Sequence, residues 1–171
     1  MPLTLCTPQL SLRDEFIAHA RDWQAHGDDH YAAAIADFDT YVRGLQDAQA
    51  GLNLPAYWVP TTTFWLTGEG QILGCSRLRH QLTPRLMNEG GHIGYDVRPS
   101  ARRRGHGTQL LRLTLVEAHR AGITNVRITC DDDNVASKTM IEHAGGVFAG
   151  SGVSPQSGKR VLQYWIRIDV P

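Results

Sequence analysis

The segment VRPSARRRGHGTQLL, residues 97–111, constrains the fold more than any other part of the sequence. It places three arginines and two glycines between a strand, which Pro99 ends, and a leucine-rich helix over residues 107–120. The first amides of a helix have no partner within it, and Gly105 and Gly107 permit positive φ and a close approach of an anion. The segment therefore predicts a phosphate or pyrophosphate site; a solvated basic loop that caps the helix is the alternative.

The remaining pattern predicts one α/β domain over residues 1–171, a length that suits a single core. Helices are expected over residues 11–26, with Ser11 as N-cap, 30–50, ended by Gly51, 107–120 and 134–144, and residues 83–91 form a loop or short helix. Strands are expected over residues 61–67, 72–82, 92–99, 124–130, 147–153 and 159–168. Because a helix joins the strands at 92–99 and 124–130, they should connect in parallel with right-handed topology, giving a central mixed sheet with helices on both faces.

Composition excludes several classes of protein. The chain has 17 basic and 17 acidic residues, so a main role in coating nucleic acid or an anionic membrane is disfavoured, and binding through the arginine run is a weak reading. No targeting segment or membrane-span length of apolar residues is visible, and three scattered cysteines indicate free thiols. A cytoplasmic protein is expected, and the sequence leaves a homodimer open.

No metal site is expected. The run CDDDN invites a calcium reading, but an EF-hand loop needs glycine at its sixth position and oxygen ligands at alternate positions, where Val135 and Ala136 stand. The eight histidines show no paired ligand spacing.

Other nucleotide motifs fail at the arginine-glycine segment. The dinucleotide fingerprint G-x-G-x-x-G would need glycine at Leu110, and the P-loop pattern is absent. The pattern R-x-x-G-x-G, Arg102 to Gly107, instead resembles the acyl-CoA pyrophosphate loop of the GNAT superfamily of N-acyltransferases, usually [QR]-x-x-G-x-[GA]. VRITCDDDNVASKTMIEHAGG resembles the next strand and helix of that fold, and most of the chain resembles a bacterial subgroup of predicted acetyltransferases.

The resemblance implies an acetyl-CoA-dependent N-acetyltransferase acting on a primary amine of a small molecule or peptide, by direct attack on the thioester. It implies that backbone amides near residues 103–108 hold the pyrophosphate while pantetheine pairs with the central strand like an added strand. The implied cofactor contacts are Tyr95, Asp96, Val97, Arg102, Arg103, Arg104, Gly105, His106, Gly107, Thr108, Asn134 and Ser137.

The catalytic groups are less clearly marked. The family often places a tyrosine acid seven residues after the asparagine, where this chain has Ile141, so Tyr95 and Tyr164 are the substitutes. Glu89 and His92 stand where such enzymes often place a base, and His92 titrates near neutral pH; a strand histidine and a solvated carboxylate are the structural alternatives. The missing tyrosine keeps a non-catalytic acyl-CoA-binding or regulatory module as the alternative function.

The acceptor side carries no recognisable motif. Arg77, Arg79 and His80 could recognise an acidic group on the acceptor, and a polar strand face directed at solvent explains them equally well.

Overall fold

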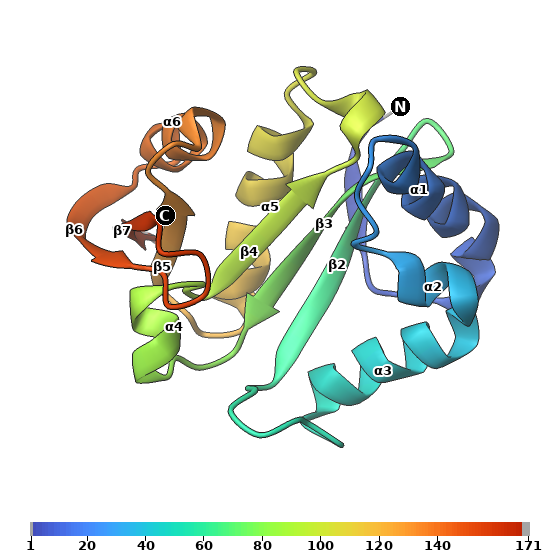
Figure 1. Ribbon diagram of the computed structural model, residues 1–171, viewed down its shortest axis with the longest axis horizontal. Helices are drawn as coiled ribbons and strands as arrows, with labels where there is room; N and C mark the ends of the chain where they lie inside the picture. The colour runs from blue at the N-terminus through green and yellow to red at the C-terminus, as the bar shows by residue number, and fades with distance from the viewer. Residues whose placement is uncertain (1, 169–171) are drawn as a thin grey trace.

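Two antiparallel sheets form the frame of the protein (Figure 1), in a computed structural model that describes residues 2–168. The larger sheet has the order β1 (Thr4–Cys6), β2 (Thr61–Gly68), β3 (Gln71–Arg79) and β4 (Ile93–Val97). The smaller sheet has the order β5 (Asn125–Asp131), β7 (Arg160–Arg167) and β6 (Val147–Val153). The helices are α1 (Arg13–Ala25), α2 (Ala32–Ala36), α3 (Phe38–Ala50), α4 (Pro84–Asn88), α5 (His106–Arg120) and α6 (Val135–His143). Residue 1 and residues 169–171, the ends of the predicted domain, lie outside the described residues.

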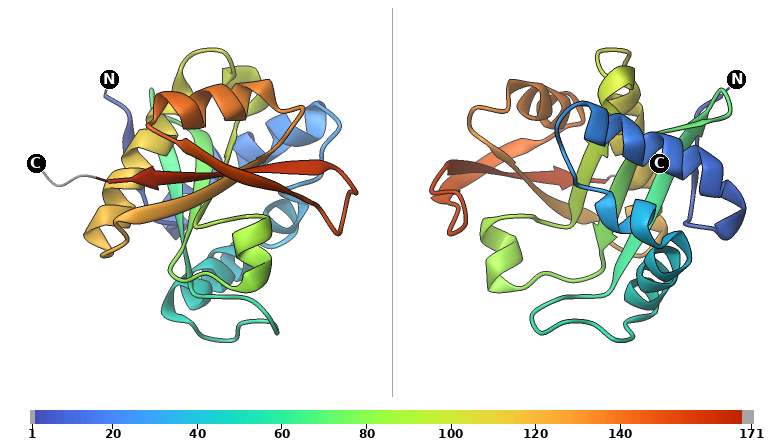
Figure 2. Two further views of the ribbon diagram at one scale, coloured as in Figure 1. Left: turned by 90° about the vertical axis from the view of Figure 1, so that its left-hand side faces the viewer. Right: turned by 45° about the vertical axis from the view of Figure 1, so that its right-hand side comes forward.

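Helices cover both faces of the larger sheet, as predicted (Figures 1 and 2). Helices α1 to α3 lie on one face, where Trp65 of β2 packs against Phe16 of α1 with ring centroids 4.4 Å apart. Helix α5 lies on the other face, where Leu66 of β2 packs with Leu110. Because neighbouring residues of a strand point to opposite faces, an unbroken apolar run such as Phe64 to Leu66 supplies both cores.

The predicted helix over residues 30–50 is wrong in one respect, because the chain breaks at Asp37. This residue is extended, with φ −152° and ψ 94°, and its carboxylate accepts hydrogen bonds from the amide and hydroxyl of Thr40 at 3.0 and 2.7 Å. Asp37 therefore caps a new helix, α3, that ends at Gly51 as predicted.

The start of α1 also differs from the prediction. Ser11 lies in a short 3₁₀ turn, Leu10–Leu12, and α1 begins at Arg13 after Leu12, with no side-chain cap. Strand β1, which pairs with β2, was not predicted because three residues are too few to show alternation.

The predicted central mixed sheet is divided in two, although the α/β class is confirmed. Helix α5 brings β5 beside β4, but within residues 2–168 no ladder of paired residues joins these strands. The strands meet at one end only, where the amide of His92 donates to the carbonyl of Arg127 at 2.7 Å. In the same place Gly91 has φ +60°, and a Cβ on it would lie 2.4 Å from that carbonyl oxygen. In Figure 1, β4 and β5 separate from this contact toward α6.

Within residues 2–168 no helix is both long enough and apolar enough to cross a bilayer.

Candidate functional site

A cleft of about 650 Å³ opens where β4 separates from β5 and α6. Its lining residues are Trp23, Tyr95, Asp96, Val97, Ala101, Arg102, Arg103, Gly105, His106, Gly107, Thr108, Asn134, Ala136, Ser137 and Met140. Every cofactor contact implied by the sequence lies on this surface except Arg104, which is exposed and 3.9 Å from Glu69. The structure thus brings the predicted residues together from β4, the loop that follows it, α5 and α6.

The loop before α5 has the backbone that an anion site needs. Gly105 has φ +79° and is the N-cap of α5, and no side chain caps the helix. A Cβ at Gly105 would meet nothing within 4 Å, so this position requires glycine for its backbone angle and not for space. The first amides of α5 are therefore left to a ligand, and the partial charge of the helix start favours an anion there.

The structure gives a reason for glycine at position 107 that differs from the predicted one. It is helical, without positive φ, and a Cβ there would lie 2.7 Å from the sulfur of Met140 on α6. Its glycine lets α6 pack close to α5, which sets the width of the cleft at this point.

Tyr95 and Ser137 meet across the cleft. The Tyr95 hydroxyl and the Ser137 Oγ are 2.6 Å apart, and the carboxamide oxygen of Asn134 accepts the Ser137 amide at 3.1 Å as the N-cap of α6. Burial raises the pKa of Tyr95 to about 12. This phenol is therefore protonated at neutral pH and able to donate a proton in the cleft.

Tyr164, the other predicted acid, does not line this cleft. It is 1% exposed and lies on a separate cavity of about 300 Å³, where its hydroxyl donates to Glu142 at 3.2 Å. Burial raises its pKa to about 12. Ile141 is fully buried in the core, so at this turn of α6 the cleft receives the side chain of Met140 instead.

Neither predicted base lines the cleft. His92 is buried, and its Nδ1 accepts the amide of Arg127 at 2.9 Å, so the ring helps to hold β4 to β5. Burial lowers its pKa. Glu89 is half-buried at the C-terminal end of α4.

The polar residues of β3 have partners within the protein. Arg77 donates to Asp96 at 2.7 Å and to the Tyr31 hydroxyl at 2.8 Å. Arg79 donates to the carbonyls of Gly90 and Gly91, and His80 bonds Thr62 at 2.7 Å. The structure therefore gives these residues internal roles, beside which acceptor recognition stays a prediction.

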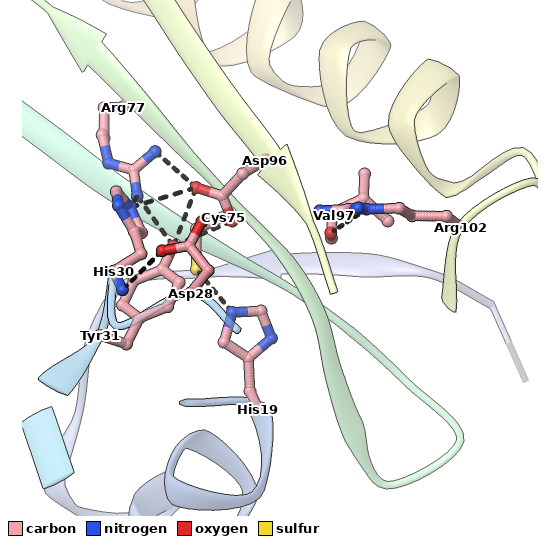
Figure 3. A network of polar contacts seen from close by, with 9 residues as sticks. All are labelled: His19, Asp28, His30, Tyr31, Cys75, Arg77, Asp96, Val97 and Arg102. Atoms are coloured by element: carbon pink, nitrogen blue, oxygen red, sulfur yellow. Dashed lines mark hydrogen bonds and ion pairs between the residues drawn. The ribbon is translucent and has the colours of Figure 1, made fainter. Parts of the chain in front are cut away.

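Asp96 joins the cleft to the N-terminal helices (Figure 3). Both carboxylate oxygens accept the Tyr31 hydroxyl at 2.9 Å, and His30 lies 3.8 Å away. The side chain of Asp96 is thus already bound to Tyr31 and Arg77, which leaves its backbone groups for the implied contact with the cofactor. Sequence reasoning missed this network because its members are far apart in the chain.

One group of side chains in residues 2–168 has the spacing of metal ligands. Ligand atoms of His19, Cys75 and Asp96 lie within 4.8 Å of one another. Burial lowers the pKa of His19 to about 4 and raises that of the Cys75 thiol, so both are neutral, and they lie 3.8 Å apart. Since Asp96 already pairs with Arg77, the cluster is balanced by the protein's own cation.

Trp23 of α1 also lines the cleft; the sequence leaves this tryptophan either in the core, which it favours, or in the substrate cleft. Its helical spacing with Phe16 and Ala20 indicates a core position, which it also occupies. No local signal could have distinguished the two roles.

Comparison with known proteins agrees with this geometry. A sequence profile of the acetyltransferase (GNAT) family matches residues 20–145. No curated protein sequence is similar enough to count as a match.

Several solved structures share the fold. An acetyltransferase from Salmonella typhimurium, described as modifying the N-terminal serine of ribosomal protein L7/L12, is 17% identical with a TM-score of 0.70, over 98% of this chain and 95% of that one. The putative acetyltransferase yncA from the same species, solved with acetyl-CoA, is 14% identical with a TM-score of 0.66, over 99% and 95%. RimJ from Mycobacterium smegmatis, solved with CoA-disulfide, is 17% identical with a TM-score of 0.73, over 96% and 81%.

The matched profile spans most of the chain, including the glycine loop, the start of α5 and the helix α6 that together form the cleft. The chain belongs to the acetyltransferase (GNAT) family.

Proposed function

We propose that the protein transfers the acetyl group of acetyl-CoA to a primary amine of a small molecule or peptide. The observation that carries the proposal is the uncapped start of α5 beside Gly105, on a cleft of about 650 Å³. The site lies in one acetyltransferase domain over residues 1–171. Acetyl-CoA or CoA in structures of the same fold supports the choice of co-substrate.

The cofactor is held mainly by backbone groups in this proposal. Amides of residues 103–108 bind the pyrophosphate, with Thr108 adding its hydroxyl and the arginines adding positive charge. Pantetheine runs along β4, whose edge toward β5 forms no ladder within residues 2–168 and so has groups available for pairing. A strand amide then stabilises the oxyanion of the acetyl group.

In the reaction, the amine attacks the thioester carbonyl carbon, and the carbon–sulfur bond breaks as the tetrahedral intermediate collapses. We assign proton donation to the leaving thiolate to Tyr95, because its protonated hydroxyl lines the cleft and Tyr164 lies elsewhere. His92 or Glu89 accepts the proton of the amine through water, because neither reaches the cleft directly.

Tyr95→Phe tests the assignment of the acid. We expect kcat to fall roughly 100-fold while the affinity for acetyl-CoA changes little, because the ring stays and only the proton donor is lost. Tyr164→Phe is the matched control and should leave kcat unchanged. The reverse pattern would transfer the role to Tyr164.

The cellular location and the oligomeric state of the protein belong to the same proposal. Three cysteines without disulfides support a cytoplasmic protein. Strand β6 forms an outer edge of the smaller sheet and exposes Val147, Phe148 and Val153, which supports a homodimer. Light scattering coupled to gel filtration measures the mass that decides this point.

A non-catalytic acyl-CoA-binding module is the second candidate, because the family's usual tyrosine position is a buried isoleucine. An assay of CoA release over a panel of amines, run beside a thermal-shift titration with acetyl-CoA, separates the two. Binding with amine-dependent CoA release supports the enzyme, whereas binding without release from any amine supports the module.

A further inference from the structure

Helix α1 reaches the cleft through one side chain, Trp23. Among the described residues that line the cavity, all others come from β4 onward. Trp23 is 8% exposed and packs beside His30 and Tyr31 on its other sides. An aromatic side chain from the N-terminal helices therefore forms part of the wall opposite α6.

The position of Trp23 against the arginine loop is fixed by its neighbour. The Asp22 carboxylate accepts the amide of Ser100 at 2.9 Å and lies 3.5 Å from the guanidinium of Arg98. Both partners belong to the segment that leads from β4 to the glycine loop. The end of α1 and this segment are thus tied together immediately beside the indole.

Arg102 lies over the Trp23 ring. Its guanidinium carbon is 5.0 Å from the ring centroid, and its Nε donates to the carbonyl of Val97 at 3.2 Å. A guanidinium at this distance from an indole face is held by a cation–π interaction. The contact keeps a positive charge at the rim of the cleft, next to the indole.

The indole N–H of Trp23 is buried and has no hydrogen-bond partner. Buried donors nearly always have partners, so each exception needs a reason. Within residues 2–168 the buried side-chain nitrogens without a hydrogen-bond partner are Trp23 Nε1, Trp65 Nε1, both ring nitrogens of His106, and Arg98 Nε, which forms an ion pair with Asp22. Three of these five atoms belong to Trp23 and His106, which line the cleft, so polar atoms without a hydrogen-bond partner gather around this cavity.

We infer that Trp23 is a cofactor-contacting residue whose indole N–H donates to a phosphate oxygen of CoA. The inference rests on the proposed function, because it assumes that CoA occupies the cleft. Arg102 is exposed, so in this inference its guanidinium gives up the hydrogen bond to the Val97 carbonyl and turns toward the same phosphate that accepts the indole N–H. Phosphate is the chemistry that fits one neutral donor and one cation beside the helix start.

The test is Trp23→Phe, with Trp65→Phe as the matched control. Trp65 is also buried with an unpartnered N–H, but it lies in the core against Phe16 and not on the cleft. Calorimetric titration should show acetyl-CoA binding to Trp23→Phe about tenfold more weakly than to the wild type, and to Trp65→Phe unchanged. If the contact is to the 3′-phosphate, dephospho-CoA should bind Trp23→Phe and wild type equally; if it is to the pyrophosphate, the tenfold difference should persist.

A measurement on the wild-type protein removes any dependence on how Trp23→Phe folds. The indole ¹⁵N–¹H signal of Trp23, assigned by elimination from Trp58→Phe, Trp65→Phe and Trp165→Phe, should move when CoA is added, and that of Trp65 should not. A stationary Trp23 signal in protein saturated with CoA, or equal affinity in a folded Trp23→Phe, would overturn the inference alone. Failure of the wild type to bind acetyl-CoA would overturn the proposed function and the inference with it.

Discussion

The two sides of the cleft differ in whether backbone groups or side chains form them. The wall formed by the glycine loop, α5 and α6 offers backbone amides and an uncapped helix start, and its glycines keep side chains away. The opposite side, where Trp23 of α1 and Asp96 of β4 line the cleft, is closed by side chains, and behind it Asp96 is bonded to Arg77 of β3 and to Tyr31. The first arrangement suits a ligand used by many proteins, because backbone groups do not depend on side-chain identity. The second depends on each residue and can be changed one residue at a time.

Removing one charge from the side-chain wall should have the largest effect. Asp96→Asn leaves Arg77 without its carboxylate in a largely buried setting, so we expect the free energy of unfolding to fall by about 3 kcal/mol. Urea denaturation measures this loss. The exposed pair of Arg13 and Asp39, 2.6 Å apart, is the control, and Asp39→Asn should cost less than about 1 kcal/mol. Equal losses of unfolding free energy in Asp96→Asn and Asp39→Asn would show that burial does not make the Arg77–Asp96 pair more important for stability than the exposed pair.

The same wall should give the protein a dependence on pH. Burial lowers the pKa of His19 from 6.5 to about 4, so between these values the unfolded chain binds a proton that the native protein does not. The free energy of unfolding should therefore fall as pH is lowered from about 6.5 to 4, by about 3 kcal/mol from this residue. His19→Gln should remove that part of the slope, whereas a change at the exposed His26 should leave it in place. A wild-type slope in His19→Gln would assign the effect to other groups.

The backbone wall should fail when glycine is lost at its centre. Gly105→Val strains a φ of +79° and places a side chain at the helix start, so the thermal stabilisation by acetyl-CoA should disappear. At 100 times Kd that stabilisation is about 2.7 kcal/mol. Gly122→Val is the control, because Gly122 follows the other end of α5 with φ +81° and open space around it. It should lose similar stability and keep its response to acetyl-CoA; an undiminished response in Gly105→Val would remove the phosphate site from this loop.

The smallest effect is expected where α5 and α6 meet. Gly107→Ala places a methyl group against the sulfur of Met140, whose flexible end can move, so the cost should be about 1 kcal/mol. Combining it with Met140→Ala should cost less than the sum of the two single changes, because the second change makes room for the first. Additive costs from thermal denaturation would show that the two residues do not limit each other.

The backbone wall could be predicted from the sequence, because its information is local. The pattern from Arg102 to Gly107, followed by leucines at helical spacing, specifies a strand, a turn with positive φ and a helix start within a few residues. The role of Gly107 was predicted for the wrong reason, since its partner Met140 belongs to another helix. Close packing between helices leaves no mark in a short motif.

The other wall could not be predicted, because it depends on contacts between distant residues. Tyr31 and Asp96 are 65 positions apart, and only the folded sheet brings them to 2.9 Å. The break at Asp37 was hidden for a related reason, because aspartate within a helical pattern fits both a solvent-facing position and a cap. The division of the predicted mixed sheet could not be predicted either, because the periodicity of a strand does not report where it separates from its neighbour.

The contact between Gly91 and Arg127 determines how the two sheets are placed against each other. The peptide of Arg127 packs directly against Gly91, so β4 and β5 meet at this end. The width of the cleft at the other end of β4 therefore depends on the angle between the two strands. A methyl group at position 91 would lie 2.4 Å from the carbonyl oxygen of Arg127, so the backbones of the two sheets would have to move apart at this point. The width of the cofactor cleft is thus controlled by a residue that does not line it.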